Sequence, residues 1–237
     1  MAGEELFRGG TLDMSAEPWP ALAAGSAWTD VLTNRILACA AILLLLLNML
    51  DLFRIAPHLI YSYDRSRGAA DLEHNMGLAR SRNLTALCYL LPLCLVADHF
   101  ALARPRFFGG ISPLWTAPAT IGLSLAFLLV RRLCYLLFRP ARLSGEEAST
   151  LQHNIGNYVI LLSILLLATV GLSTAFRIPD TVVRSVLLWE TAAVWLFSMV
   201  RSAQLLAAHV SGFSTFLYLC GLELFPAALL VTVVVLL

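Results

Sequence analysis

The sequence predicts an all-α fold, a polytopic transmembrane helical bundle with about six spanning helices. Of the 237 residues, 59% are hydrophobic and only 13% are charged, whereas about a quarter of the residues of a soluble domain are charged. The mean hydropathy is +0.80. The apolar residues form long runs separated by short stretches that contain arginine. This distribution is typical of a protein that crosses a bilayer several times.

A spanning helix needs about 20 mainly apolar residues. The predicted spans are 31–53, 84–99, 114–130, 155–176, 182–208 and 213–237. The second span is the shortest, and Pro92 lies in its middle. We expect residues 28–237 to form a single transmembrane domain. Residues 1–27 carry four acidic side chains and are predicted to form a polar N-terminal tail.

The arginines predict the orientation of the chain. The connections after the first and third spans contain five and four arginines, and those after the second and fourth contain two each. Because cytoplasmic loops are enriched in basic residues, the first and third connections are predicted to be cytoplasmic. Both termini then lie on the extracytoplasmic side of the membrane. The long polar connection 64–83 could include a short surface helix over 69–79.

Composition also argues against several functions. A formal net charge of +1 does not suit a nucleic-acid-binding protein, which would have a basic surface. The five cysteines lie in or beside apolar runs and form no C-x-x-C pair, so they are interpreted as small buried apolar residues. The histidine spacing matches no metal site. No catalytic constellation is recognisable, and we expect no cofactor.

Ionisable residues inside spanning segments are costly, at about 2.5 to 3.5 kcal/mol each on insertion scales. Glu190 and Arg201 in the fifth span are eleven residues apart, which is about three helical turns. They are therefore predicted to lie on one face of that helix, together with Gln204. We interpret these residues as part of a buried charge site.

A tight turn is predicted between the last two spans, because Gly212 suits a helix end and Ser214 could cap the next helix. Arg201 and Glu223 lie eleven residues on either side of Gly212. A rise of 1.5 Å per residue places both roughly 16 Å from the turn. The sequence thus predicts that Arg201 and Glu223 pair near the centre of the bilayer.

Pro226 follows Glu223 by three positions and lacks the amide donor for the carbonyl of Leu222. A carboxylate beside an unsatisfied carbonyl could serve as a cation or proton site. The same pattern suits a helix kink held by an ion pair, or a contact with a partner subunit. The sequence leaves these three interpretations open.

The run Tyr218-Leu-Cys220-Gly-Leu-Glu223-Leu-Phe-Pro226 resembles the closing Tyr-Leu-Cys-x-x-Glu-x-x-Pro motif of an uncharacterised family of small inner-membrane proteins from Bacteroidota. The resemblance implies an inner-membrane location and draws attention to these four positions. It implies no activity.

The leading hypothesis for function is a non-enzymatic scaffold or accessory subunit of a membrane complex, possibly in envelope biogenesis. Its expected partners are membrane lipids and other membrane-protein subunits. The alternative is a small-solute or proton-coupled transporter component that uses a Glu223/Arg201 site. An enzyme that acts on lipid or isoprenoid substrates is a third interpretation.

Overall fold

The computed structural model describes residues 28–64, 76–102, 105–137, 145–207 and 212–236. These residues form an all-α bundle without strands, which confirms the predicted fold class. Its long helices are α1 (Leu32–Asp64), α3 (Met76–His99), α4 (Pro113–Leu137), α5 (Gly145–Phe176) and α6 (Asp180–Ala207). A composite helix ends the bundle: α7 (Gly212–Leu219), a π-helical turn η4 (Cys220–Leu224) and α8 (Phe225–Leu236). Two short 3₁₀ helices, η2 (Trp28–Asp30) and η3 (Arg106–Gly110), precede α1 and α4.

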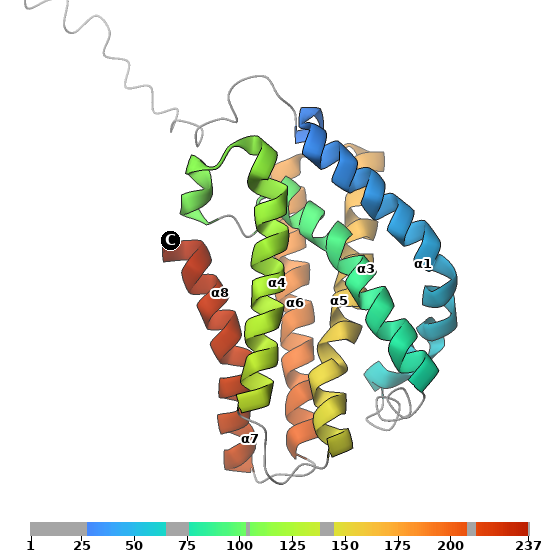
Figure 1. Ribbon diagram of the computed structural model, residues 1–237, viewed down its shortest axis with the longest axis vertical. Coiled ribbons are helices and arrows are strands. Elements are labelled where there is room, and N and C mark those ends of the chain that lie inside the picture. Colours follow the sequence, from blue (N-terminus) through green and yellow to red (C-terminus); the bar gives the residue numbers. More distant parts are fainter. Residues whose placement is uncertain (1–27, 65–75, 103–104, 138–144, 208–211, 237) are drawn as a thin grey trace, which may run out of the picture.

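Five of these helices are long and apolar enough to cross a membrane, and they correspond to five of the six predicted spans. The sixth, α3, begins with a polar stretch that contains Arg80 and Arg82 and ends beside Asp98. It packs against α1, α4 and α5. Figure 1 shows it running diagonally alongside α1, on the side of α1 that faces the other helices. Contact with helices on several sides explains why its sequence is less apolar than that of the others.

Several helices are longer than the sequence predicts. The first span was expected to end at residue 53, but α1 continues to Asp64 and accommodates Pro57. The third span was expected to end at residue 130, with residues 133–138 continuing along the membrane interface, and α4 is one continuous helix through Leu137. Of the predicted surface helix 69–79, residues 76–79 form the start of α3, and the rest lies outside the described residues.

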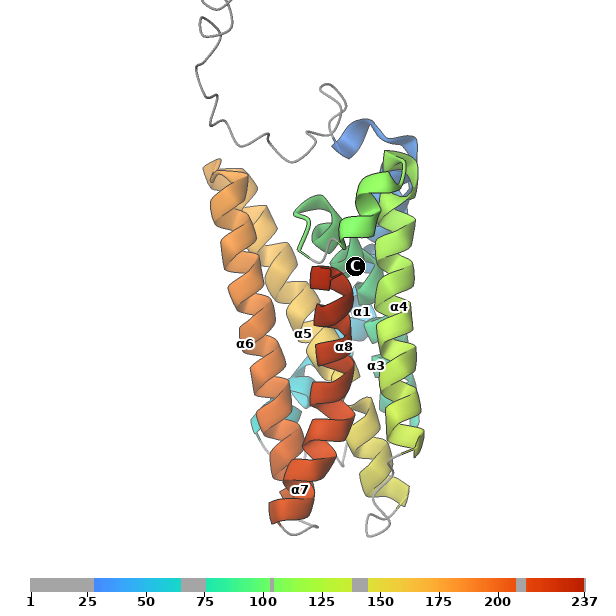
Figure 2. The ribbon, with the colours of Figure 1, turned by 90° about the vertical axis from the view of Figure 1, so that its left-hand side faces the viewer.

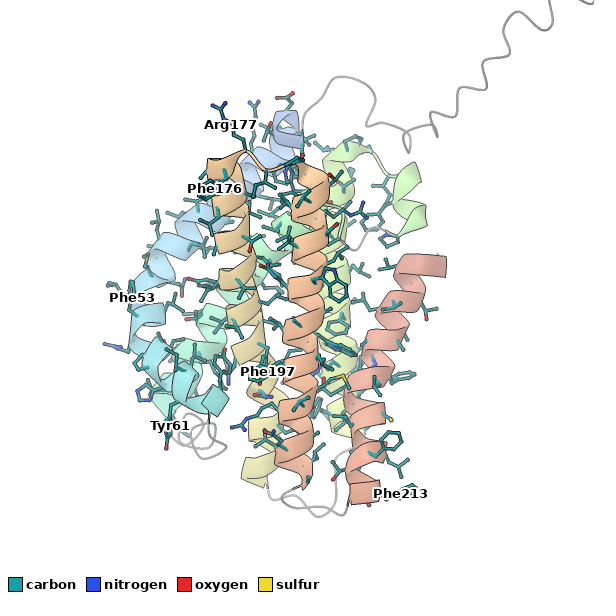
Figure 3. All side chains as sticks on the ribbon, turned by 180° about the vertical axis from the view of Figure 1, so that it is seen from behind. Phe53, Tyr61, Phe176, Arg177, Phe197 and Phe213 are labelled. Carbon is teal, nitrogen blue, oxygen red and sulfur yellow. The ribbon has the colours of Figure 1, made fainter. Side chains whose placement is uncertain are left out.

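The helices alternate in direction along the bundle. Helices α4 and α6 end, and α5 and α7 begin, at one end of the molecule (Figures 1 and 2). We call this the Leu137 end, after the last residue of α4. Figure 3 shows Phe213 near this end and Arg177 at the opposite end. The alternation agrees with the predicted order of spans, and the side of the membrane on which each end lies remains a prediction.

Helices α3 and α5 run side by side in the interior. The Ser163 hydroxyl of α5 donates a hydrogen bond to the Tyr89 carbonyl of α3 at 3.0 Å. At Gly156, a Cβ would stand 3.5 Å from the Cβ of Ala86, an ordinary van der Waals distance, so α5 packs directly against α3 at this point. This contact fixes the register against which α1 and α6 pack.

Candidate functional site

The most strongly polar part of the described interior is a cluster around Glu223. Arg131 of α4 donates hydrogen bonds from Nε to Glu223 Oε2 at 3.2 Å and from Nη2 to Oε1. The Tyr135 hydroxyl donates to Oε1 at 2.8 Å, and the Ser202 hydroxyl of α6 donates to the same oxygen at 3.2 Å. We call these four residues the Glu223 centre. It joins α4, α6 and η4 through one carboxylate.

The centre is closed to its surroundings. The exposed fractions are 4% for Arg131, 6% for Glu223 and 0% for Ser202. A buried charge is tolerated when it is paired and its remaining hydrogen-bonding positions are filled. Both oxygens of Glu223 accept from Arg131, and Oε1 also accepts from two hydroxyls. The carboxylate is therefore held in place by donors from two helices besides its own.

A π-helical turn positions Glu223. The Phe225 amide donates to the carbonyl of Cys220, five residues back, which is the π-helical pattern. Pro226 follows at once and has no amide hydrogen to continue an α-helical ladder. Leu222, Glu223 and Pro226 are all buried. The wider turn thus accommodates the proline and directs Glu223 into the bundle, and it replaces the simple proline kink that the sequence suggests.

On α4, Arg131 faces inward and its neighbour Arg132 faces outward. Successive residues of an α-helix point about 100° apart, so only one of two adjacent arginines can reach the interior. Tyr135 is one turn beyond Arg131, and the Arg131 guanidinium lies 4.8 Å from the centre of its ring. Arg131 and Tyr135 therefore share the face of α4 that approaches η4.

The predicted pairing of Arg201 with Glu223 is wrong. Arg201 donates to the Gln204 side chain at 2.9 Å and to the backbone carbonyl of Ser62, at the end of α1, at 3.2 Å. The position opposite Glu223 belongs to Ser202, the next residue of α6. The residue of α6 that contacts Glu223 is therefore one position from the predicted one. Because α6 is oriented about its axis so that Ser202 faces Glu223, Arg201 faces α1 instead.

Glu223 lies eleven residues after Gly212, the first residue of α7, which corresponds to about 16 Å of helix. Its partners Arg131 and Ser202 lie six and five residues before the last described residues of α4 and α6. The predicted hairpin turn at 208–211 lies outside the described residues. Ser214 is inside α7, which begins at Gly212, so it does not cap that helix.

Glu190 lies apart from the other charged residues. Its Oε1 accepts a hydrogen bond from the Thr169 hydroxyl of α5 at 2.5 Å, whereas its buried Oε2 has no partner. The structure thus brings Arg201 and Gln204 together, as predicted for one helix face, but divides the predicted charge site into three places. These are Glu190 with α5, Arg201 with α1, and Glu223 with α4.

The other motif residues support the π turn. Tyr218 packs against an apolar cluster that includes Cys134, Leu206 and Leu222. Cys220 supplies the carbonyl that closes the π turn, and Pro226 is buried directly after it. Sequence reasoning missed Arg131, Tyr135 and Ser202. The available signal was the spacing of Arg131 and Tyr135, four residues apart, just beyond the predicted end of an apolar span.

A second polar contact lies toward the opposite end of the bundle. Asp98 of α3 accepts from the Trp28 indole at 2.8 Å and from the Thr120 hydroxyl of α4 at 3.2 Å. This contact fixes η2, just ahead of α1, onto the ends of α3 and α4. Asp98 is partly buried and lies near the end of α3, which ends at His99.

Comparison of the chain with protein-family models, with curated proteins and with solved structures gave no match. The resemblance to the Bacteroidota family therefore stays a prediction. Within the described part of the chain, no three His, Cys, Asp or Glu side chains converge as metal ligands would. Of the five histidines of the sequence, His74 and His209 lie outside the described residues, and the side chain of His153 is not described.

Proposed function

We propose that the protein is a non-enzymatic scaffold or accessory subunit of a membrane complex in a bacterial inner membrane, with a role in envelope biogenesis. The observation that supports this proposal best is the Glu223 centre. Its one carboxylate is bonded by Arg131, Tyr135 and Ser202. A centre of this kind holds helices in a fixed arrangement, which suits a protein that presents a constant surface to others.

The same centre is poorly suited to moving a proton or an ion. A transported cation would have to displace Arg131 from both carboxylate oxygens of Glu223. Breaking a buried pair by removing one partner costs about 3 to 5 kcal/mol. Glu223 therefore fits a structural role better than a role in transport.

The outer surface of the bundle also favours a scaffold. Five helices are apolar enough to cross a membrane. In the most apolar stretch of each of them, only 11% to 22% of the residues are buried within the bundle. Large side chains such as Phe53, Trp189 and Phe213 are exposed, and Figure 3 shows Phe53 and Phe213 pointing away from the helices. Membrane lipids and other subunits are the partners that such a surface would contact.

The proposal is tested by the size and composition of the protein in native membranes. A tagged chain expressed at its native level is solubilised in a mild detergent and measured by native mass spectrometry. We expect a complex that contains a second membrane protein in a fixed ratio. Recovery of the chain only as a monomer with bound lipid would contradict the scaffold.

A transporter component is the second candidate, and one observation favours it. Arg201 is a buried cation with no carboxylate partner among the described residues, as in some solute-binding sites. Its predicted joint site with Glu223 does not form. Proteoliposomes that contain a pH-sensitive dye distinguish the candidates, because a scaffold leaves the internal pH unchanged across an imposed gradient. Proton flux by the wild-type protein across that gradient would support the transporter.

A further inference from the structure

Among the described residues, no carboxylate pairs with the buried Arg201. Its side chain is 9% exposed, and its bonds go to a neutral amide, that of Gln204, and to a backbone carbonyl, that of Ser62. Ser62 lies in the last turn of α1, where carbonyls lack an intrahelical donor. Arg201 therefore caps α1, but a carbonyl offsets only part of a full positive charge.

Part of the guanidinium is left without a hydrogen bond. The Nε atom of Arg201 is buried and has no partner. Four further donors in the described part of the chain share this property, and two of them are on α5: the hydroxyl of Tyr158 and the side-chain nitrogen of Asn154. Tyr158 is 4% exposed and Asn154 is 5% exposed. Buried donors of this kind are uncommon, because each unsatisfied group costs about 1 to 3 kcal/mol.

The packing of α5 against α6 brings these donors to one place. The rings of Tyr158 and Phe197 are in edge contact, with centroids 5.8 Å apart, and Figure 3 shows Phe197 on α6 beside α5. The two helices run in opposite directions, so one turn from Tyr158 to Asn154 matches one turn from Phe197 to Arg201. Asn154 and Arg201 therefore lie at the same level, next to Tyr158, which interacts electrostatically with Arg201.

Three unpaired buried donors at one level of the contact between α5 and α6, one of them a guanidinium, suit an anionic oxygen ligand. A guanidinium binds phosphate and carboxylate oxygens through charge-assisted hydrogen bonds. Arg201 lies six residues before the last described residue of α6, and the phosphates of lipid headgroups are one source of such oxygens. Basic pockets between membrane helices bind such headgroups.

We propose that Arg201, Tyr158 and Asn154 bind a phosphate oxygen between α5 and α6, from a phospholipid headgroup or from inorganic phosphate. The ligand accepts hydrogen bonds from the three donors and supplies the negative charge that the Arg201 cap of α1 lacks. This site is separate from the Glu223 centre and does not depend on the scaffold proposal.

Two probes test the site with the full-length protein, delipidated in detergent. Inorganic phosphate is titrated calorimetrically against chloride of equal ionic strength. Retention of phosphatidylglycerol is compared by native mass spectrometry with retention of diacylglycerol, which has the same chains and no phosphate. Binding of free phosphate identifies a soluble anion as the source, and selective retention of phosphatidylglycerol without phosphate binding identifies the headgroup.

The variants are Arg201→Gln and Tyr158→Phe, with Arg132→Gln as the matched control because Arg132 is an exposed arginine of α4. Both test variants should weaken binding of the effective probe about tenfold or more, and the control should not. Tyr158→Phe removes only a hydroxyl and decides the matter if Arg201→Gln fails to fold. Equal binding by wild type and Tyr158→Phe, or no binding of either probe by wild type, overturns the proposal.

Discussion

Arg131 and Glu223 form a two-pronged ion pair between α4 and the π turn of the last helix. The Nε atom of Arg131 donates to one carboxylate oxygen at 3.2 Å and Nη2 donates to the other. The two residues are separated by 92 positions in the chain. This contact explains how a helix interrupted by a π turn and a proline is held against the bundle.

Removal of Arg131 should destabilise the protein strongly. Arg131→Gln leaves Glu223 as a buried carboxylate without a cation, and we expect the free energy of unfolding to fall by about 3 to 5 kcal/mol. Unfolding in mixed micelles of increasing SDS content measures this loss. Arg132→Gln is the control and should change the free energy by about 0.5 kcal/mol or less, because its side chain is exposed. Equal losses in the two variants would contradict the assigned pairing.

A double-mutant cycle should identify the partner of Glu223. For Arg131→Gln and Glu223→Gln we expect a coupling energy of about 1 to 3 kcal/mol, because the two side chains share hydrogen bonds. The coupling of Arg201→Gln with Glu223→Gln should be less than half as large, since Arg201 contacts Ser62 and Gln204. A larger coupling with Arg201 would restore the pairing predicted from the sequence.

The two hydroxyls of the centre should contribute unequally. The Tyr135 hydroxyl accepts from Arg131 at 3.2 Å and donates to Glu223 at 2.8 Å, whereas the Ser202 hydroxyl makes a single longer bond to Glu223. We therefore expect Tyr135→Phe to cost about 1.5 to 3 kcal/mol and Ser202→Ala about 1 kcal/mol. The same SDS titration measures both. The reverse order would show that Ser202 is the main hydroxyl donor.

The indole of Trp28 should anchor the start of α1. Trp28→Phe removes the hydrogen bond to Asp98 and keeps an aromatic ring near His99. A hydrogen bond to a charged acceptor is worth about 1.5 to 3 kcal/mol, so η2 should detach before the bundle unfolds. Limited proteolysis near residue 30 should become faster while the midpoint of global unfolding changes little. Unchanged cleavage would mean that other contacts hold this segment.

The sequence predicted the helices well because the apolar runs are long and each leaves a clear signature. It could not predict the partner of Glu223, because that choice depends on the rotation of α6 about its axis, and one residue of α6 corresponds to about 100°. Arg131 was missed for a related reason. It follows the predicted end of an apolar span and was counted among loop arginines, whereas α4 continues past it to Leu137. To predict the π turn, one must know which carbonyl accepts the hydrogen bond from the Phe225 amide. The presence of Pro226 alone does not specify that carbonyl.

The same substitution at the buried Glu223 and at the half-buried Glu190 should lower stability by very different amounts. At position 223, Gln retains an acceptor for Tyr135 and Ser202 but leaves Arg131 as an uncompensated cation, so Glu223→Gln should lose about 3 kcal/mol or more. At position 190, Gln retains the oxygen that accepts from Thr169, and no described cation loses its partner. Glu190→Gln should therefore change the free energy of unfolding by about 1 kcal/mol or less.

SDS titrations of the two variants, run beside Thr169→Val, test the contrast. Thr169→Val removes the only hydrogen bond shown for the Glu190 side chain among the described residues, so it should be more damaging than Glu190→Gln. A loss at position 190 as large as that at 223 would indicate a cation near Glu190 and would place a second charge pair within the bundle.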